Sequence, residues 1–482
     1  MNHQTSVGLR IASVFALICL ISNAETATIT AGDLSAGAAR IDITPEMGVS
    51  LDGSISKNGV VESIHDRLHA RALVLDDGKT RIAMVIVDNC MTSRDVFDKA
   101  KASVHQATGF PIDHMLMAST HTHAAPRTAH ISREPIDDRY HDQVSDGISR
   151  AILAAIENLR PAQIGYASFD RPSLIACRRF ICEPGTVEAN PFGELGEQIK
   201  SVAGRSSGVI GPAGPVDPQF SILSVRHRDQ TPLCVLGNFS VHYCGGYQRG
   251  AVSADYFGFF SREIESLLKH DSAHPPVVGI MSNGTSGNTG AFQRSDGKKF
   301  KPFEGMQHYG RMLASETRQL LDEIEYRSDV SIGMLQQQLT LGVRRPSEER
   351  LAWATKTIGQ PKAEHTHRWS LIYAQEAQHL SKYPSEKTIV LQAIRIGDIG
   401  IAAAPCEVFA ETGLGIKSAS PFRHTFSIEL ANGYGGYLPT LEQHQLGGYE
   451  TWPARSSFLE KNAEQKIRST LVDSLQQLDG EP

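Results

Sequence analysis

The chain has 482 residues, of which 40% are hydrophobic and 21% charged, and its formal net charge at neutral pH is -6. This length and apolar content are sufficient for one large domain or two smaller ones. The acidic balance argues against a nucleic-acid-binding protein, which would show a basic patch or stripe.

Residues 1–24 have the pattern of a secretory signal peptide. Arg10 precedes an apolar run over 11–21, and the small residues of Ser22-Asn23-Ala24 predict cleavage near Ala24. The run is too short for a mature membrane anchor, and no later run reaches the roughly 18 apolar residues that a membrane helix needs. Cleavage would remove Arg10, the only charged side chain of this segment, and change the net charge from -6 to -7. We therefore expect an exported protein, periplasmic or secreted, with residues 25–482 as one domain.

The rest of the chain alternates strand and helix patterns. Apolar runs bounded by turn residues predict strands, and apolar residues at helical spacing predict helices. Strands are expected at 81–88, 114–119, 220–227, 233–242, 276–281, 389–396, 399–404 and 425–430. Helices are expected from an N-cap at Ser93 to just before Gly109, at 141–159, 253–269, 408–417 and 458–478, and as charged surface helices within 346–387. This order predicts an α/β fold of mixed β-sheets covered by helices.

A His-x-His pair, His121 and His123, directly follows the strand expected at 114–119. Ligands and metals are commonly bound where strands of such sheets end, so this position favours a functional role. Chance is the alternative, because the chain has 19 histidines, and His365 with His367 in a polar helical stretch is interpreted as a chance pair.

Three more strand ends carry candidate groups: His242, Glu407 and Tyr434. Two histidines and one glutamate form a known catalytic zinc set with a position left for water, although manganese or iron could use the same donors. Each residue also has a structural alternative. His242 could be a core histidine bonded to backbone, Glu407 could favour a helix N-terminus through the dipole, and Tyr434 could be a packing residue.

Six cysteines remain after the predicted cleavage, because Cys19 lies in the signal peptide. Export permits disulfides, and Cys177 with Cys182 could close a short loop, but the pairing cannot be read from the sequence. The six are Cys90, Cys177, Cys182, Cys234, Cys244 and Cys406.

An ordered set of motifs resembles the neutral (alkaline, non-lysosomal) ceramidases and their bacterial relatives. It covers most of residues 35–455. The motifs are Gly37-Ala38-Ala39-Arg40-Ile41-Asp42-Ile43-Thr44-Pro45, the run Ile64 to Leu73, Thr120-His121-Thr122-His123, Asn238-Phe239-Ser240-Val241-His242, Pro405-Cys406-Glu407, and Asn432-Gly433-Tyr434 with Tyr437.

The resemblance implies a zinc-dependent hydrolase of sphingolipid metabolism that cleaves an amide (N-acyl) bond with metal-activated water. One zinc per chain would be held by His121, His242, Glu407 and Tyr434. Catalytic roles would fall to His123, Arg178, Ser286 and His444, and substrate contacts to Arg179, Tyr437 and Tyr449. His123 would pass a proton to the leaving amine, and an arginine would stabilise an oxyanion. The implied fold is a ceramidase-like catalytic domain without the C-terminal immunoglobulin-like domain of longer members.

Two departures from the family pattern leave the substrate open. Asn288 stands where the family loop has its serine, with Ser286 two positions earlier, and His444 stands where a tyrosine is usual. The alternatives are a zinc hydrolase of an ester or a non-lipid amide, and a non-catalytic exported metal-binding relative. The expected partner is a small-molecule or lipid substrate, with no nucleic acid and no transmembrane segment in the mature chain.

Overall fold

The computed structural model describes residues 1, 33–51, 59–126, 128–129, 131, 137–201, 208–291 and 300–480. The predicted cleavage site near Ala24, the rest of the predicted signal peptide after Met1, and Cys19 lie outside the described residues. None of the helices in the described ranges is long and apolar enough to cross a membrane.

An eight-stranded sheet forms the larger part of the fold, in the order β14-β12-β11-β6-β1-β3-β4-β5. Its two halves are β14-β12-β11-β6 and β1-β3-β4-β5. Only two residue pairs join them, Ser35 with Pro161 and Ala36 with Arg160, so we describe them as two four-stranded units. The strands are β1 (Ser35–Asp42), β3 (His69–Asp76), β4 (Arg81–Val87), β5 (Met115–Ser119), β6 (Arg160–Asp170), β11 (Gln219–His227), β12 (Pro232–Phe239) and β14 (Val278–Asn283).

A separate four-stranded sheet has the order β16-β17-β18-β20. Its strands are β16 (Ile332–Gly342), β17 (Glu386–Ile396), β18 (Ile399–Ala403) and β20 (His424–Ile428). One buried cluster joins this sheet to both halves of the larger one, with Met84, Leu236 and Ile401 among its members. The three units therefore share a single core, which stabilises their relative positions.

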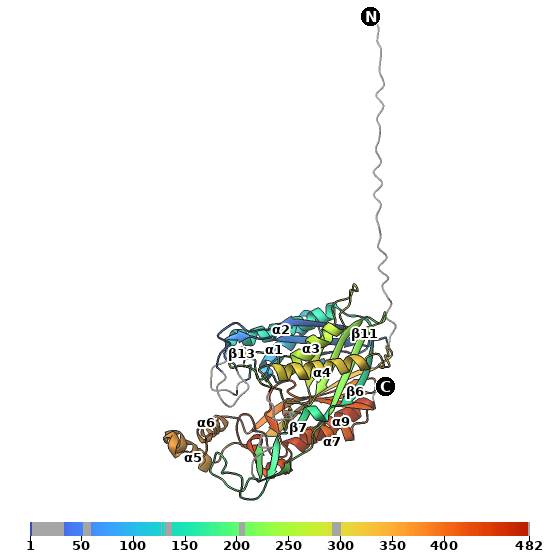
Figure 1. Ribbon diagram of the computed structural model, residues 1–482. Helices are drawn as coiled ribbons and strands as arrows, with labels where there is room; N and C mark the ends of the chain where they lie inside the picture. Colours follow the sequence, from blue (N-terminus) through green and yellow to red (C-terminus); the bar gives the residue numbers. More distant parts are fainter. Residues whose placement is uncertain are drawn as a thin grey trace.

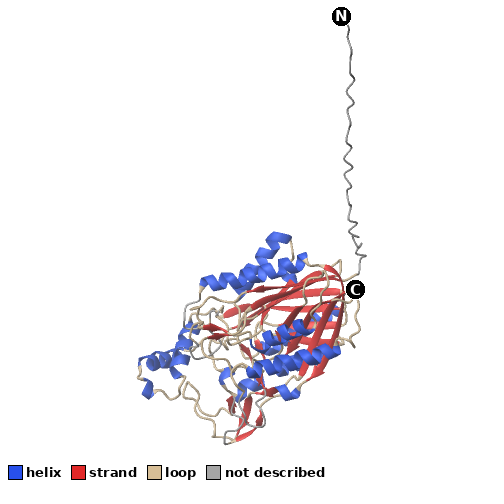
Figure 2. Ribbon diagram, turned by 45° about the horizontal axis from the view of Figure 1, so that its top comes forward, coloured by secondary structure: helices blue, strands red, loops and turns tan. Residues whose placement is uncertain are grey.

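Helices cover the outer faces of the three units (Figures 1 and 2). Apolar residues of α1 (Arg94–Thr108) and α2 (Asp138–Glu157) pack on the β1–β3–β4–β5 half. Those of α3 (Asp255–Leu267) and α4 (Glu304–Leu320) pack on the other half. The third sheet is covered by α7 (Ala410–Ala419) and α9 (Ala463–Asp479). Each outer face thus buries its apolar side chains against an amphipathic helix pair.

Most of the remaining elements are short, and η1 (Ile112–His114) lies at the start of β5. The helices α5 (Glu348–Gly359) and α6 (Ser370–Ser381) project from the body in Figure 1. The others are β2 (Ser63–Ile64), η2 (Pro172–Leu174), β7 (Ile175–Cys177), β8 (Arg179–Cys182), β9 (Ile199–Ser201), β10 (Val209–Pro212), β13 (Ala251–Val252), β15 (Thr289–Ala291), η3 (Lys362–Glu364), β19 (Glu407–Val408), β21 (Tyr437–Leu438), α8 (Leu441–Leu446) and η4 (Tyr449–Thr451).

Parallel pairing places several strand ends together. The parallel pairs β4–β5, β12–β14 and β18–β20 each end near the other two. The N–H of Asn432 donates to the carbonyl of Met117 at 2.7 Å, and the N–H of Glu429 donates to the carbonyl of Asn283 at 3.2 Å. These bonds join the segment after β20 to β5 and β14, so residues following strands of all three units meet at one place.

The predicted elements are confirmed with small shifts. The strand expected at 233–242 ends at Phe239, because the chain leaves the sheet before His242. The helix expected at 408–417 begins at Ala410, because Glu407 and Val408 pair with β21. Ser93 is the residue before α1 but makes no side-chain cap; its hydroxyl donates to the carbonyl of Thr128 instead.

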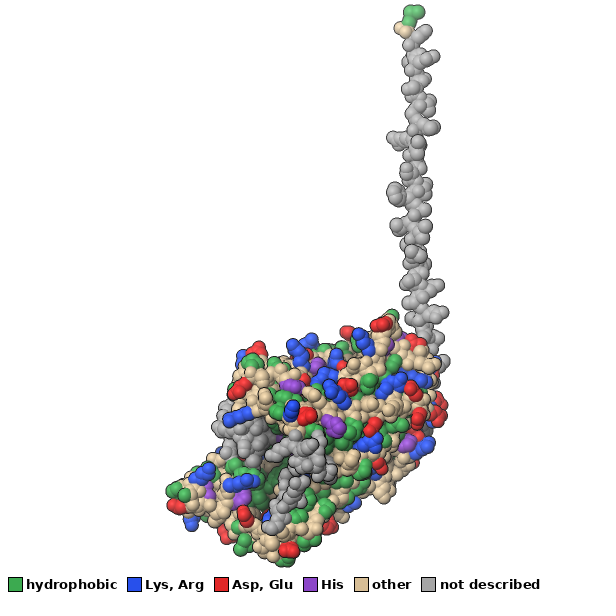
Figure 3. Space-filling model, in the orientation of Figure 1, with side chains coloured by type: hydrophobic (Ala, Val, Ile, Leu, Met, Phe, Trp, Pro, Cys, Tyr) green, Lys and Arg blue, Asp and Glu red, His purple; other side chains and the backbone are tan. Residues whose placement is uncertain are grey.

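Cys177 and Cys182 both carry free thiols, so the disulfide considered between them is not formed. The thiol of Cys177 donates instead to the carbonyl of Arg179 at 3.3 Å. Lysine and arginine side chains are intermixed with aspartate and glutamate on the face shown in Figure 3, in keeping with the acidic net charge.

Candidate metal centre

Three buried side chains from the three structural units converge at the meeting point of the strand ends. His121 follows β5, His242 follows β12, and Glu407 begins β19 after β18. Nε2 of His121 lies 2.9 Å from Nε2 of His242 and 3.4 Å from Oε2 of Glu407, and Nε2 of His242 lies 3.7 Å from that oxygen. Their exposed fractions are only 1%, 2% and 1%. These donor atoms are close enough to hold one metal ion.

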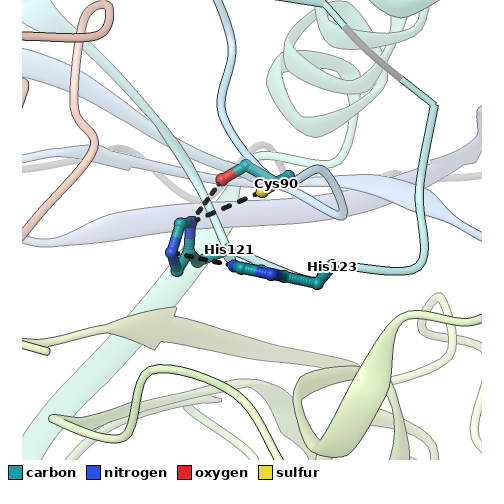
Figure 4. A group of neighbouring side chains, drawn as sticks. All are labelled: Cys90, His121 and His123. Atoms are coloured by element: carbon teal, nitrogen blue, oxygen red, sulfur yellow. Dashed lines mark hydrogen bonds between the residues drawn. The ribbon is translucent and has the colours of Figure 1, made fainter. Parts of the chain in front are cut away.

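The backbone fixes the orientation of His121. Its φ of 77° lies in the left-handed region, which costs energy for a residue other than glycine. Its N–H donates to the carbonyl of Asn89 at 2.9 Å, and its Nδ1 lies 2.7 Å from the carbonyl oxygen of Cys90 (Figure 4). A carbonyl can only accept, so Nδ1 carries the proton and Nε2 presents a lone pair.

His242 is held in the same way. Its Nδ1 lies 3.1 Å from the carbonyl oxygen of Ser286, so this nitrogen also donates and its Nε2 also presents a lone pair. Oε2 of Glu407 is buried and has no hydrogen-bond donor among the residues that the structure describes. Two imidazole lone pairs and one carboxylate oxygen therefore face one point without a proton between them. This is the kind of ligand set that binds a divalent cation.

The second oxygen of Glu407 is bonded to Tyr434. The phenol donates to Oε1 at 2.7 Å. Burial would raise the pKa of Glu407, but Arg178 and the Tyr434 hydroxyl are among the groups that bring the pKa below its usual value. Burial, followed by the charge of Arg178, lowers the pKa of His242 well below its usual value. The carboxylate is therefore ionised and the imidazole neutral at neutral pH, which are the forms that bind a metal.

His123 lies beside this cluster and is half-buried. Its Nε2 is 3.2 Å from Nε2 of His121, and its ring stacks on Tyr243 with the centroids 3.9 Å apart. Cys90, His121 and His123 form a second group of potential ligand atoms that shares His121 with the first (Figure 4). The sequence prediction missed both Cys90 and Tyr243.

Ser286 lies behind His242 rather than between the converging nitrogens. Its hydroxyl is 3.4 Å from Nδ1 of His242, across the ring from Nε2. The same hydroxyl donates to Oε1 of Glu429, and the side chain is fully buried. The structure thus places Ser286 next to a predicted ligand, in contact with a carboxylate that the sequence prediction did not include.

Arg178, Tyr437 and Tyr449 form a connected group beside His242. Nη2 of Arg178 donates to the Tyr437 hydroxyl at 3.0 Å and to the carbonyl of Gly287 at 2.8 Å. The two phenol oxygens are 2.9 Å apart, and the guanidinium lies 5.5 Å from each ring centroid. The Tyr437 ring stacks over His242 with the centroids 6.5 Å apart. These three predicted site residues are therefore brought together.

Arg179 and His444 have other surroundings. All three guanidinium nitrogens of Arg179 donate to protein groups, including Glu450 at 2.5 Å and the carbonyl of Gly447 at 2.7 Å, and the side chain is fully buried. The substrate contact predicted for Arg179 therefore competes with this internal network. Burial and the charges of Arg344, Lys461 and Arg179 lower the pKa of His444 to about 3. No hydrogen bond joins His444 to the cluster in the described part of the chain.

The sequence of the chain is similar to those of neutral ceramidases. The sequence model described as "Neutral/alkaline non-lysosomal ceramidase, N-terminal" matches residues 34–298. The chain is 32% identical to neutral ceramidase 3 of Arabidopsis thaliana over 142 residues, which is 27% of this chain and 19% of that protein. It is 27% identical to neutral ceramidase A of Dictyostelium discoideum over 259 residues, or 51% of this chain and 33% of that protein. These alignments span a third or less of the curated relatives.

Solved structures show the same fold. The neutral ceramidase from Pseudomonas aeruginosa superposes with a TM-score of 0.69 at 19% identity, covering 93% of this chain and 75% of that chain. A structure described as "Ceramidase complexed with C2" gives a TM-score of 0.68 at 18% identity, covering 93% of this chain and 76% of that chain.

Proposed function

The chain belongs to the neutral/alkaline non-lysosomal ceramidase family, and from this premise we propose that it is an exported, metal-dependent hydrolase that cleaves the amide bond of an N-acyl substrate of the ceramide type. Export rests on the predicted signal peptide at residues 1–24. The preferred metal is zinc, one ion per chain, because imidazole and carboxylate donors suit it.

The convergence of His121, His242 and Glu407 carries the proposal. Their three acceptor atoms are buried, and Oε2 of Glu407 has no donor. A cation held by these residues would polarise an amide carbonyl and lower the pKa of a bound water. The resemblance to the family makes Tyr434 the fourth proposed ligand of the metal. Its contact with Oε1 of Glu407 also gives it a role in orienting that carboxylate.

Protein side chains around the centre would carry the proton and the charge. His123 is half-buried, and its Nε2 adjoins that of His121. We assign it the transfer of a proton to the leaving nitrogen, a role that imidazole suits at neutral pH. Arg178 would hold the developing negative charge of the carbonyl oxygen. The contacts to Tyr437 and Gly287 fix this guanidinium beside the centre.

We propose that Ser286 supports His242 rather than attacking the substrate. Its hydroxyl faces Nδ1 and Glu429, and it is fully buried. Water would then be the attacking group. We propose Tyr437 and Tyr449 as substrate contacts, and we give Arg179 a structural role because its three nitrogens already donate to protein groups.

Metal analysis and turnover on a substrate panel test this function. Protein purified without chelators should contain one zinc per chain, lose activity on chelation and regain it when zinc is returned. The panel compares N-acylsphingosine, N-acyl amino acids, fatty-acid esters and short peptides. Preference for the N-acylsphingosine supports the proposal, whereas preference for an ester or a peptide would favour a different hydrolase. Protein without stoichiometric metal would refute it.

A further inference from the structure

We infer that Glu429 is a positioning residue of the metal centre, whose carboxylate fixes His242 and Glu407 relative to one another. This inference rests on the proposed function. Glu429 follows β20 and is fully buried. It touches neither His121 nor the point at which the three donor atoms meet, so its effect is exerted through its neighbours.

Glu429 supports Glu407 through a hydrogen bond to the next residue. Oε2 of Glu429 accepts a hydrogen bond from the N–H of Val408 at 2.8 Å. Val408 directly follows Glu407, and the two residues are the whole of β19, which pairs only with the equally short β21 among the described strands. Such a short strand has few ladder bonds of its own. The contact with Glu429 therefore adds to the few backbone bonds that hold this ligand, such as those from Glu407 N–H to the carbonyl of Gly436 and from Gly287 N–H to the carbonyl of Val408.

Glu429 supports His242 through hydrogen bonds to Ser286. Oε2 of Glu429 also accepts from the N–H of Ser286 at 3.2 Å, and its Oε1 accepts from the Ser286 hydroxyl. Ser286 in turn provides the carbonyl that accepts from Nδ1 of His242. One carboxylate thus holds the segment that fixes the tautomer and ring orientation of this ligand, the role that outer-shell carboxylates play in metal sites.

The chemistry of these donors explains why a carboxylate suits this position. Glu429 meets two backbone N–H groups and one hydroxyl, and in the described part of the chain no basic side chain is bonded to it. A carboxylate only accepts, so both oxygens match donors, and these hydrogen bonds oppose burial and the charge of Glu407, which together raise the pKa of Glu429 well above its usual value. The amide of a glutamine has one accepting oxygen, and its NH2 group would meet the Ser286 hydroxyl, which would have to turn from donating to accepting although it already accepts from Asn283.

Glu464 provides a matched control. It is also a buried glutamate, with an exposed fraction of 5%. Its carboxylate accepts from the Thr412 hydroxyl at 3.0 Å and pairs with Arg468 at 3.0 Å. Neither partner adjoins a predicted ligand. Substituting Glu464 therefore perturbs a buried carboxylate without touching the supports of His242 and Glu407.

The experiment measures metal affinity without reference to catalysis. Metal-free wild type, Glu429→Gln, Glu429→Asp and Glu464→Gln are titrated with Zn²⁺ alone against a chromophoric chelator, and with Co²⁺ alone to record its visible absorption. We expect Glu429→Gln to bind Zn²⁺ about 10- to 100-fold more weakly and to show a changed Co²⁺ spectrum. Glu429→Asp keeps the charge but is shorter, so an intermediate loss is expected. Glu464→Gln should match the wild type in both measurements, even if its unfolding midpoint falls.

Each outcome supports or overturns the inference. Wild-type affinity and spectrum in a folded Glu429→Gln would overturn it, and so would equal losses in Glu429→Gln and Glu464→Gln. If Glu429→Gln does not fold, as judged by near-ultraviolet circular dichroism, Glu429→Asp decides in the same way. A wild-type protein that binds no stoichiometric metal would refute the proposed function as well, whereas normal metal binding in Glu429→Gln would overturn only the role of Glu429.

Discussion

Replacing Gly287 by alanine should displace a metal ligand without altering any predicted ligand side chain. Gly287 lies against β19, and a Cβ built on it would come within 2.4 Å of the carbonyl oxygen of Glu407 and 2.8 Å of its carbonyl carbon. Ordinary contacts of this kind begin near 3.4 Å. The backbone of Glu407 or of the Gly287 loop must therefore move by about 1 Å, whereas ligand distances in metal sites tolerate only about 0.2 Å.

Two quantities should respond. Overpacking of this kind costs about 1–3 kcal/mol in the free energy of unfolding, and the shifted carboxylate should weaken metal binding by about 10- to 100-fold. The matched control is Gly290→Ala, three residues further along, where a new Cβ meets no atom of the described residues within 4 Å. Gly290→Ala should remain within about 1 kcal/mol of the wild type. Urea unfolding and chelator competition measure both effects. Gly287→Ala behaving like Gly290→Ala in both assays would refute the reasoning.

Three further predictions concern other parts of the molecule. His123→Ala should retain its metal, measured by elemental analysis, while kcat falls about 10²- to 10⁴-fold; loss of the metal would instead make His123 a ligand. Arg179→Ala removes the closest ion-pair partner of the buried Glu450, which keeps Arg178 at 3.5 Å, and should cost up to about 3–5 kcal/mol of unfolding free energy in urea. Removing Arg350 from its more exposed pair with Glu194 should cost about 1 kcal/mol or less. Burial and Arg71 lower the pKa of His69 to about 3 in the folded protein. In the unfolded chain this imidazole binds a proton near pH 6.5, so the stability that neutral His69 contributes is complete above that pH and is lost progressively toward pH 3. The loss should reach at most about 2 kcal/mol of unfolding free energy at pH 5. A His69→Asn variant with an unchanged pH dependence of unfolding would contradict this.

The predicted ligands illustrate what sequence patterns can locate. His121, His242 and Glu407 each follow an apolar run that forms a buried strand. Strand ends are recognisable from local sequence, so the candidates could be listed without knowing how the sheets pack. Their convergence could not be derived in this way, because it depends on the shared core of three units and on bonds such as that from Asn432 to Met117.

The neighbouring arginines show where local patterns fail. Nothing in Cys177-Arg178-Arg179-Phe180 distinguishes the two side chains. Successive residues of extended chain point to opposite sides, and here Arg178 contacts Tyr437 while Arg179 pairs with Glu450. Only the tertiary structure decides which of the two faces the centre.

Glu429 was missed for a related reason. It lies within the strand predicted at 425–430, where an acidic residue after Ile428 indicates only an exposed position. Its donors, the N–H groups of Val408 and Ser286, come from segments that are far away in the sequence. An acidic residue between two apolar residues of a predicted strand is the signal that could have been followed.

Protonation is one way to satisfy the centre without a metal, and the surroundings of His242 oppose it. Both Nδ1 atoms donate to carbonyls, so a proton between the two Nε2 atoms requires an imidazolium. Burial and Arg178 hold the pKa of His242 well below its usual value. Such a proton would also leave Oε2 of Glu407 without a donor, whereas one divalent cation satisfies all three atoms together. Metal-free protein should therefore lose stability relative to the metal-bound form, and equal unfolding midpoints with and without saturating Zn²⁺ would contradict this account.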